Sequence, residues 1–176
     1  MRLRAVEPGD LEVIVAGDHD TDSARSGWRI FPPRSVWAAA EWVDQQTRRP
    51  NDGDEFRLVI EALDSTDAVG SLNTQGCDPV AGTFGYGITV APWARRRGYA
   101  SDAVIVLLGY LFGERRYQKC TVGAYAFNEG SVAFHQALGF QIEGHIRRAH
   151  FTAGRHWDEV VLGLTVEEFT ARHPLG

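Results

Sequence analysis

The segment from Thr83 to Ala124 constrains the fold more than any other part of the chain, because its hydrophobic pattern changes period twice. A strand-like run over 83–90 is followed by a helical apolar pattern over 100–112 and a second strand-like run over 119–124. This order predicts a right-handed βαβ unit with two parallel strands. The inward face of the helix is expected to carry Ala103, Val104, Leu107, Leu108 and Leu111.

The other elements are predicted from period and turn residues. Strand-like runs over 56–62, 68–73 and 83–90, separated by Asp, Ser, Gly and Pro turns, are typical of an antiparallel meander. The expected elements are a strand over 3–6, a helix from about Asp10, an irregular polar stretch over 17–34, a helix over 35–48 with Val36, Ala39, Ala40 and Val43 on one face, strands over 56–62 and 68–73, a helix over 131–138, paired strands over 140–163 and a short helix after Thr165.

Length and charge narrow the class of protein. The 176 residues predict one domain spanning 1–176, and a net charge of −5 argues against a nucleic-acid partner. The cysteines, Cys77 and Cys120, form no CxxC pair or disulfide framework, which favours a reducing compartment. With no signal-like or membrane-spanning apolar run, we expect a cytoplasmic protein without a membrane partner.

The junction between the strand at 83–90 and the next helix predicts a phosphate site. Backbone N–H groups at a helix N-terminus are unpaired and favour an anion. Gly98 and Ala100 leave the main chain accessible, and the run Arg95 to Arg97 adds positive charge. A solvated basic turn is the alternative interpretation. The sequence contains no GxxxxGK[ST] loop and no complete GxGxxG fingerprint, which excludes those phosphate loops.

The run Arg95-Arg96-Arg97-Gly98-Tyr99-Ala100 resembles the (Gln/Arg)-x-x-Gly-x-(Gly/Ala) signature of GNAT acetyltransferases. The segment 127–140 resembles the second landmark of that family, and residues 143–158 resemble the branch that acetylates ribosomal-protein N-termini and polyamines. The resemblance implies a mixed α/β GNAT-like fold. Its sheet would be mostly antiparallel, with about six to seven strands, a central splayed parallel pair and helices on both faces.

The resemblance also implies acetyl-CoA as co-substrate and no metal. In the family the pantetheine bonds to the backbone of the first splayed strand, and the diphosphate lies on the glycine loop. Asn128 falls on the asparagine of the second landmark, although a plain helix N-cap explains it as well. The candidate cofactor-binding residues are Ile88, Thr89, Val90, Arg95, Arg96, Arg97, Gly98, Tyr99, Ala100, Ser101 and Asn128.

Candidates for proton transfer come from the second landmark. His135 stands where many similar proteins have a tyrosine, and Ser131 shares its helix face at i and i+4, while Phe134 and Leu138 are expected to pack inward. A histidine can protonate the departing thiolate, but an exposed helix histidine is the alternative. The family's glutamate base would fall on Gly85, so the base is left open among Glu143, His145, His150 and Asp158.

The acceptor is the least specified part of the prediction. Trp28, Phe31 and Tyr86 are candidate substrate residues, although loop anchoring and strand packing explain them equally well. The run Asp18-His19-Asp20-Thr21-Asp22 is interpreted as a solvated loop rather than a metal site. The expected activity is direct acetyl transfer to a primary amine of a small molecule or a peptide N-terminus. A silent acetyl-CoA sensor and a succinyl-type acyltransferase stay as alternatives, and a homodimer is left open.

Overall fold

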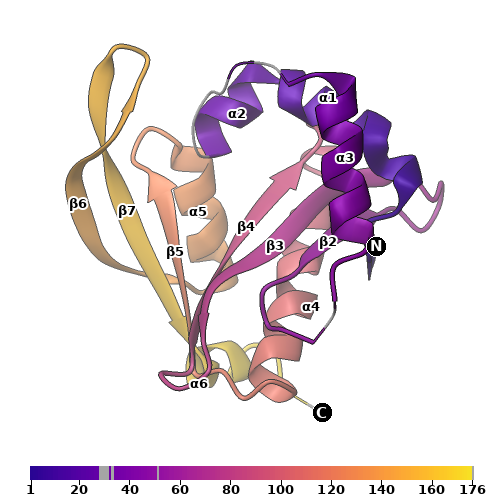
Figure 1. The fold of residues 1–176 in the computed structure, drawn as a ribbon. Coiled ribbons are helices and arrows are strands. Elements are labelled where there is room, and N and C mark those ends of the chain that lie inside the picture. The colour runs from indigo at the N-terminus through magenta and orange to yellow at the C-terminus, as the bar shows by residue number, and fades with distance from the viewer. Residues whose placement is uncertain (28–31, 33, 51, 176) are drawn as a thin grey trace. The chain divides into compact units, whose positions relative to one another are not determined.

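The computed structural model describes residues 1–27, 32, 34–50 and 52–175 (Figure 1). Within these residues, seven strands are hydrogen-bonded in the order β1-β2-β3-β4-β5-β7-β6. The elements are β1 (Arg2–Arg4), α1 (Leu11–His19), α2 (Thr21–Gly27), α3 (Val36–Thr47), β2 (Arg57–Glu61), β3 (Ala68–Asp78), β4 (Thr83–Val90), α4 (Tyr99–Gly113), β5 (Lys119–Tyr125), α5 (Glu129–Leu138), β6 (Gln141–Thr152), β7 (Arg155–Thr165) and α6 (Val166–Thr170), with 3-10 turns η1 (Pro8–Asp10) and η2 (Pro92–Ala94).

The strand pairing confirms the predicted mixed α/β fold. β4 and β5 are parallel, with Thr83 opposite Lys119 and Phe84 opposite Cys120. Antiparallel pairing joins β1 to β2, β2 to β3, β5 to β7 and β6 to β7. The parallel pair flanks α4, as the two changes of hydrophobic period over 83–124 predict.

The prediction of an irregular stretch over 17–34 is wrong for residues 17–27, most of which are helical. α1 continues to His19, and α2 follows over Thr21–Gly27, with the amide of Ala24 donating to the carbonyl of Asp20 at 2.9 Å. The sequence of α2 is almost entirely polar. A helix without an apolar stripe gives no hydrophobic period, so a pattern search reads it as a loop.

The described chain divides into two compact units, each with its own core. The first comprises Met1–Thr74 and Gly87–Ala103. Its core joins Val6, Val43, Val59 and Ala68, against which Leu11, Val13, Ile14 and Trp42 of α1 and α3 pack. Helices α1 and α3 lie beside β2 and β3 in Figure 1. Val36, predicted on the inward face of α3, is instead 61% exposed, because it stands in the first turn directly after the N-cap Ser35.

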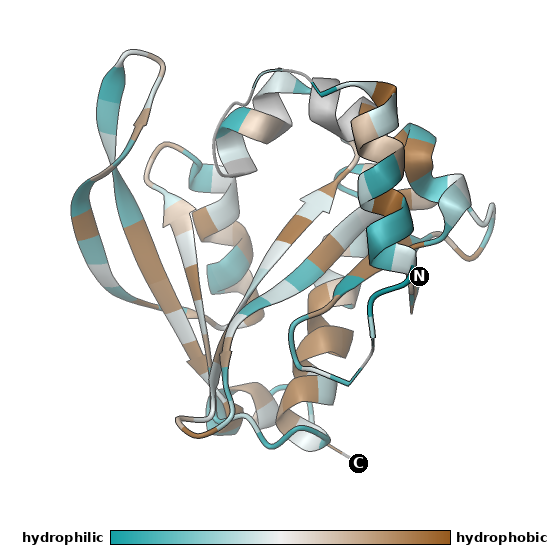
Figure 2. Cartoon of the chain, viewed as in Figure 1, coloured by the Kyte–Doolittle hydropathy of each residue, from teal (hydrophilic) through white to brown (hydrophobic). Residues whose placement is uncertain are grey.

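The second unit comprises Gln75–Tyr86 and Val104–Gly176. The predicted inward face of α4 is confirmed, because the five residues predicted to form it are each at most 1% exposed. Rings of Phe84, Phe112 and Tyr117 meet edge to face in the second core, with centroids 5.2 to 5.6 Å apart. In Figure 2 much of α4 and of β7 has the colour of hydrophobic residues. The prediction of a single domain over 1–176 stays a prediction.

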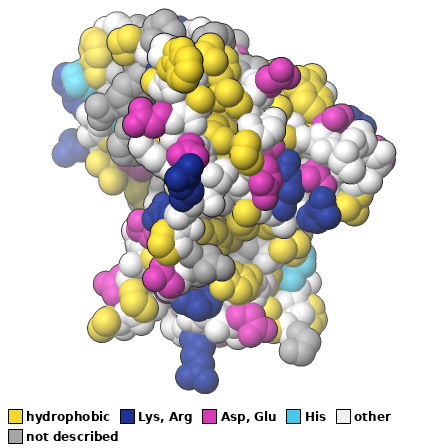
Figure 3. Space-filling model, turned by 45° about the vertical axis from the view of Figure 1, so that its right-hand side comes forward, with side chains coloured by type: hydrophobic (Ala, Val, Ile, Leu, Met, Phe, Trp, Pro, Cys, Tyr) yellow, Lys and Arg dark blue, Asp and Glu magenta, His cyan; other side chains and the backbone are white. Residues whose placement is uncertain are grey.

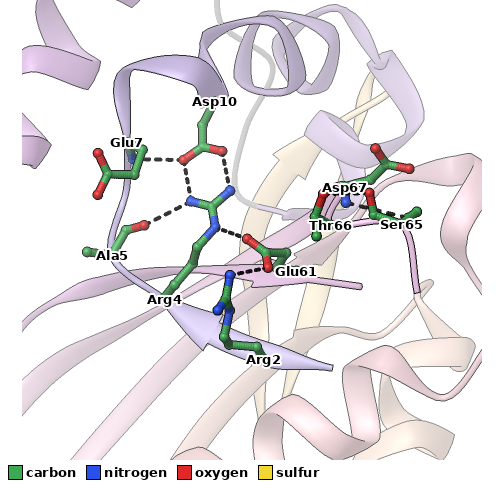
Figure 4. A network of polar contacts seen from close by, with 9 residues as sticks. All are labelled: Arg2, Arg4, Ala5, Glu7, Asp10, Glu61, Ser65, Thr66 and Asp67. Carbon is green, nitrogen blue, oxygen red and sulfur yellow. Dashed lines mark hydrogen bonds and ion pairs between the residues drawn. The ribbon is translucent and has the colours of Figure 1, made fainter. Parts of the chain in front are cut away.

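A partly buried ion-pair network ties the N-terminal strand of the first unit to its neighbours (Figure 4). The guanidinium of Arg4 donates to both carboxylate oxygens of Asp10 at 2.8 and 2.7 Å, and its Nε donates to Glu61. Arg2 donates to the same Glu61 carboxylate. Asp10 and Glu61 are only 3% and 4% exposed, so these carboxylates depend on the arginines for compensation of their charge.

The surface is mixed in charge. Figure 3 shows acidic and basic side chains interspersed on one face, with hydrophobic side chains between them. Among the helices that the structure describes, none is long and apolar enough to cross a membrane.

Candidate acetyl-CoA and acyl-transfer site

The predicted phosphate loop lies in the first unit and has left-handed backbone at two positions. Arg96 has φ +61° and Gly98 has φ +85°. The amide of Asp102 donates to the carbonyl of Gly98 at 3.1 Å, so Gly98 caps the first turn of α4. The amides of Tyr99 to Ser101 therefore have no carbonyl to meet within the helix. Left-handed turns beside such amides form concave anion sites.

The side chains around this loop leave its main chain open. A Cβ added at Gly98 would meet no atom within 4 Å. Arg96 and Arg97 are exposed, and the guanidinium of Arg97 lies 5.5 Å from the ring centroid of Tyr99. Arg95 is directed differently, because it donates to the carbonyl of Val90 at 3.2 Å and to Asp20 at 3.3 Å. The residues present fit a bound diphosphate, with Arg96 and Arg97 better directed toward an incoming anion than Arg95.

The strand end that precedes the loop is held by the backbone of β3. A Cβ at Gly70 would lie only 2.3 Å from the carbonyl oxygen of Thr89, and the amide of Ala91 donates to the carbonyl of Val69 at 2.8 Å. This close approach requires glycine at position 70. The first unit therefore brings together the predicted cofactor residues Ile88 to Val90 and Arg95 to Ser101.

The remaining predicted residues of the second landmark gather in the second unit. Asn128 is the N-cap of α5, and its side-chain oxygen accepts from the amide of Ser131 at 3.1 Å. The N-cap interpretation therefore holds for Asn128, while its contact with a cofactor stays a prediction. Ser131 lies one turn before His135, and its Oγ is 3.5 Å from the Nδ1 of that histidine.

His135 is buried rather than exposed, at 5% of its accessible surface. Its ring packs 5.7 Å from the ring of Tyr86 and 5.3 Å from the ring of Phe140. The expectation that Phe134 and Leu138 form a packing face separate from His135 is wrong, since His135 and Leu138 are both buried. The turn at Gly139 returns the chain so that Phe140 contacts the helix face of His135.

The surroundings of His135 keep its imidazole neutral near pH 7. Burial lowers the pKa of His135, and the hydrogen bond to the carbonyl of Ser131 opposes that effect only in part. Nδ1 lies 2.7 Å from this carbonyl oxygen, which can only accept, so Nδ1 carries the proton. Nε2 is then the basic nitrogen of the ring.

The three predicted substrate residues have different outcomes. Tyr86 is 4% exposed, and burial raises the pKa of its hydroxyl well above the ordinary value. That hydroxyl has no hydrogen-bond partner within the part of the chain that the structure describes. This burial favours strand packing for Tyr86. Trp28 and Phe31 lie outside the described residues.

The backbone explains why position 85 carries no carboxylate. A Cβ at Gly85 would lie 2.8 Å from the carbonyl oxygen of Thr121 in β5. Real Cβ atoms do not approach a backbone oxygen so closely, so β4 has no room for a side chain there. A glutamate base at this position is sterically incompatible with the observed pairing.

The alternative bases are engaged to different extents. Glu143 forms an ion pair with Lys119 at 2.7 Å, and Asp158 accepts from the amide of Arg148 at 2.8 Å. His145 is exposed on β6. His150 lies 3.0 Å from Glu159, a residue that sequence reasoning missed because no motif contains it. Over the described residues, no group of three or more His, Cys, Asp and Glu side chains could hold a metal ion.

We expect Gly85→Ala to lower the free energy of unfolding by about 1–3 kcal/mol, because the added methyl group meets the β5 backbone, which cannot move aside as a side chain can. Gly109→Ala in α4 is the matched control. A Cβ there meets no atom within 4 Å, so that variant should gain about 0.5–1 kcal/mol from helix propensity. Urea denaturation measures both, and equal stabilities for the two variants would contradict the steric argument.

Comparison with known proteins identifies the family. A family model described as an acetyltransferase (GNAT) domain matches residues 1–141. A prophage-derived uncharacterized N-acetyltransferase, YokL of Bacillus subtilis, is 35% identical over 173 residues, covering 98% of this chain and 94% of that protein.

Solved structures share the fold at lower identity. A spermidine N-acetyltransferase from Vibrio cholerae in complex with CoA and spermine superposes with a TM-score of 0.82 at 22% identity, covering 96% of each chain. A dodecameric structure of spermidine N-acetyltransferase from the same organism gives a TM-score of 0.77 at 22% identity, covering 98% of this chain and 97% of that one. The chain belongs to the GNAT acetyltransferase family, and it is an N-acetyltransferase.

Proposed function

We propose that this enzyme moves the acetyl group of acetyl-CoA directly to a primary amine of a small molecule or a peptide N-terminus. The observation that carries the proposal is the left-handed, glycine-opened loop at the start of α4, with Arg96 and Arg97 exposed beside it. That loop supplies unpaired amides and positive charge for the diphosphate of the co-substrate.

We further propose that amines of lowered pKa are better acceptors than lysine-like amines. An amine must be neutral to attack a thioester, and position 85 has no side chain that could deprotonate it. A lysine-type amine with a pKa of about 10.4 is only ~0.1% neutral near pH 7.5, whereas an α-amine of pKa about 7.7–8.0 is roughly one-third neutral. An α-amine therefore needs less help from a base.

Release of CoA thiol from acetyl-CoA tests the function. The amines to compare are an alanine peptide, n-butylamine, 1,4-diaminobutane and lysine, each with acetyl-CoA and with succinyl-CoA. Thiol release that depends on an amine supports the enzyme, with the α-amine of the peptide expected to be the best acceptor at neutral pH. Acetyl-CoA binding without turnover would indicate a sensor, and faster release from succinyl-CoA would indicate a different acyl group.

His135 is the proposed proton carrier, with Ser131 holding its ring through the main-chain carbonyl. We expect His135→Ala to lower kcat by about 10²-fold, since general acid–base catalysis contributes about 10²–10⁴, while the affinity for acetyl-CoA changes little. Because His135 is neutral near pH 7, the loss should be greatest at low pH, where more of the ring can carry the proton. Activity measured from about pH 6 to pH 9 with saturating acetyl-CoA checks this.

Phe140→Leu is the control for packing, because it loosens the site around the ring and retains the imidazole. If His135→Ala turns over at the wild-type rate throughout the pH range, the proton comes from solvent. Tyrosine at position 135 is a poor rescue, because a larger ring would overpack the buried site between Tyr86 and Phe140.

Location and assembly are proposals as well. Cys77 and Cys120 are not joined by a disulfide in the described structure, and Cys120 is buried, which suits a reducing cytoplasm. Self-association is proposed at the level of a homodimer, and a related enzyme of this fold forms a dodecamer. Light scattering at several concentrations measures the oligomeric state.

A further inference from the structure

The carboxylate of Glu159 lies directly over a glycine of the neighbouring strand. A Cβ added at Gly123 of β5 would lie 1.7 Å from Oε1 of Glu159 and 2.8 Å from its Cδ. Any other residue at position 123 would displace the carboxylate. Its second oxygen, Oε2, lies 3.0 Å from Nε2 of His150 on β6. Glycine at position 123 therefore creates a notch in which Glu159 is held from one side by a histidine.

The same arrangement occurs a second time on this sheet, where a primary ammonium group occupies it. The carboxylate of Glu143 lies over Gly163, at 2.4 Å from an added Cβ. There the partner is the ammonium of Lys119, with Nζ 2.7 Å from Oε1 of Glu143. The chain itself thus shows that a glutamate lying in a glycine notch of this sheet accepts a primary ammonium group.

Both notches open on one face of the second unit. Alternate residues of a strand share a face, and so do residues directly opposite each other. Gly123 is opposite Val161, which stands between Glu159 and Gly163 on β7. Lys119 and Gly123 likewise share a face of β5. The side chain of Glu159 is 25% exposed, so solvent reaches its carboxylate.

Aromatic rings line the Glu159 notch. The ring of Tyr125 meets the ring of His150 at 4.3 Å, and it stacks on Phe127 at 5.2 Å. Trp157 packs 4.9 Å from Phe127, and the guanidinium of Arg155 lies 3.7 Å from the Trp157 ring centroid. Ring faces attract cations, and Arg155 shows that this cluster accommodates one. A carboxylate beside aromatic rings is suited to an alkylammonium ligand.

We propose that Glu159 binds a primary ammonium group of the acceptor other than the amine that is acetylated, in the position that Lys119 takes at Glu143, with His150 as the positioning residue that fixes the carboxylate. As an assignment of the acceptor subsite, the proposal rests on the proposed function. It concerns acceptor binding and involves no covalent step. Glu159 of β7 pairs with Tyr125, which lies three residues before Asn128, so the carboxylate is beside the end of β5 that leads into the second landmark.

Glu159→Gln tests the proposal without changing side-chain volume. For 1,4-diaminobutane, whose second amine can stay charged while the first is acetylated, we expect KM to rise roughly tenfold or more, because a charge-assisted hydrogen bond is lost. The kcat at saturating amine should stay within about threefold, and the calorimetric affinity for acetyl-CoA should not change. Glu143→Gln is the matched control, which removes an equivalent carboxylate already paired with Lys119, and its amine KM should equal that of the wild type.

The variants Gly123→Ala and Gly163→Ala provide an independent test of the same proposal. Gly123→Ala should reproduce the rise in KM because it displaces Glu159, whereas Gly163→Ala displaces Glu143 and should leave KM unchanged. In both cases the added methyl group meets the end of a flexible side chain, so both variants should fold, which thermal melting checks. The proposal is overturned if Glu159→Gln has the wild-type KM. It is also overturned if KM rises equally in Glu159→Gln and Glu143→Gln, or equally in Gly123→Ala and Gly163→Ala.

A binding measurement separates this inference from the proposed function. n-Butylammonium chloride is titrated into the CoA-saturated wild type, Glu159→Gln and Glu143→Gln. If no amine supports thiol release, the proposed function fails, and the titration still decides the subsite. Weaker binding only in Glu159→Gln supports it, whereas no binding to the wild type, or equal binding to all three proteins, overturns it.

Discussion

Gly98→Val is expected to lower the affinity for acetyl-CoA by at least tenfold, or about 1.4 kcal/mol. Gly98 has φ +85°, a conformation that a β-branched residue adopts only with strain. The isopropyl group would also occupy the open space over the main chain, where no atom lies within 4 Å of an added Cβ. The diphosphate would then be kept from the amides of Tyr99 to Ser101, which open α4.

The control for this prediction is Gly154→Val in the turn between β6 and β7. Gly154 has φ +77° and equally open space, so the variant carries a similar backbone strain away from the loop. Isothermal titration calorimetry should show wild-type affinity for acetyl-CoA in Gly154→Val and a strong loss in Gly98→Val. Equal affinities in all three proteins would remove the diphosphate from this loop.

Arg4→Met is expected to have the largest effect on stability, about 3 kcal/mol in the free energy of unfolding, or a Tm lower by roughly 10 °C. The variant leaves the Asp10 carboxylate, 3% exposed, without the two hydrogen bonds from the guanidinium. We place the effect at the lower end of the range for a broken buried pair, because 21% of the Arg4 side chain is exposed. Denaturation in urea at pH 7 measures it.

Arg48→Met is the matched control, because the Arg48–Asp44 pair is exposed at 78% and 56% and should contribute less than about 0.5 kcal/mol. If Arg4→Met also lowered the free energy of unfolding by less than about 0.5 kcal/mol, solvent would be compensating the charge of Asp10. The two variants differ in the burial of the partner carboxylates and in the number of contacts, since Arg4 also donates to Glu61, so their difference compares a partly buried network with an exposed pair.

The Arg4 effect should depend on pH. Burial raises the pKa of Asp10, but hydrogen bonds from Arg4 and from the amide of Glu7 outweigh it, so the net shift is downward. The hydrogen bond from Arg4 lowers the pKa of Glu61, against an opposing effect of burial. Depressed carboxylate pKa values stabilise the fold above the unfolded values, about 3.9 and 4.3, and this stabilisation is lost as the pH falls through the folded values. The gap between wild type and Arg4→Met should therefore narrow in acid.

Local patterns were sufficient for much of the fold. The apolar residues of α4 recur at helical spacing and are all buried, and the strands on either side of it are parallel, because local period and the handedness of crossovers leave few other arrangements. The glycine turn before α4 was predictable for the same reason. A glycine at a helix start is a local feature, and its left-handed φ at Gly98 follows from the turn it must make.

The sequence by itself determined the family, the order of elements apart from α2, and the glycine turn before α4, since each rests on residues that are neighbours in the chain. Only the tertiary structure decided that His135 is buried against Tyr86, that Gly85 lies against the carbonyl of Thr121 and that Glu159 lies in the notch at Gly123. Each of these contacts joins segments distant in sequence through the pairing and packing of β4, β5 and β7. Packing distances of this kind leave no periodic signal in the chain, because they depend on which strands become neighbours.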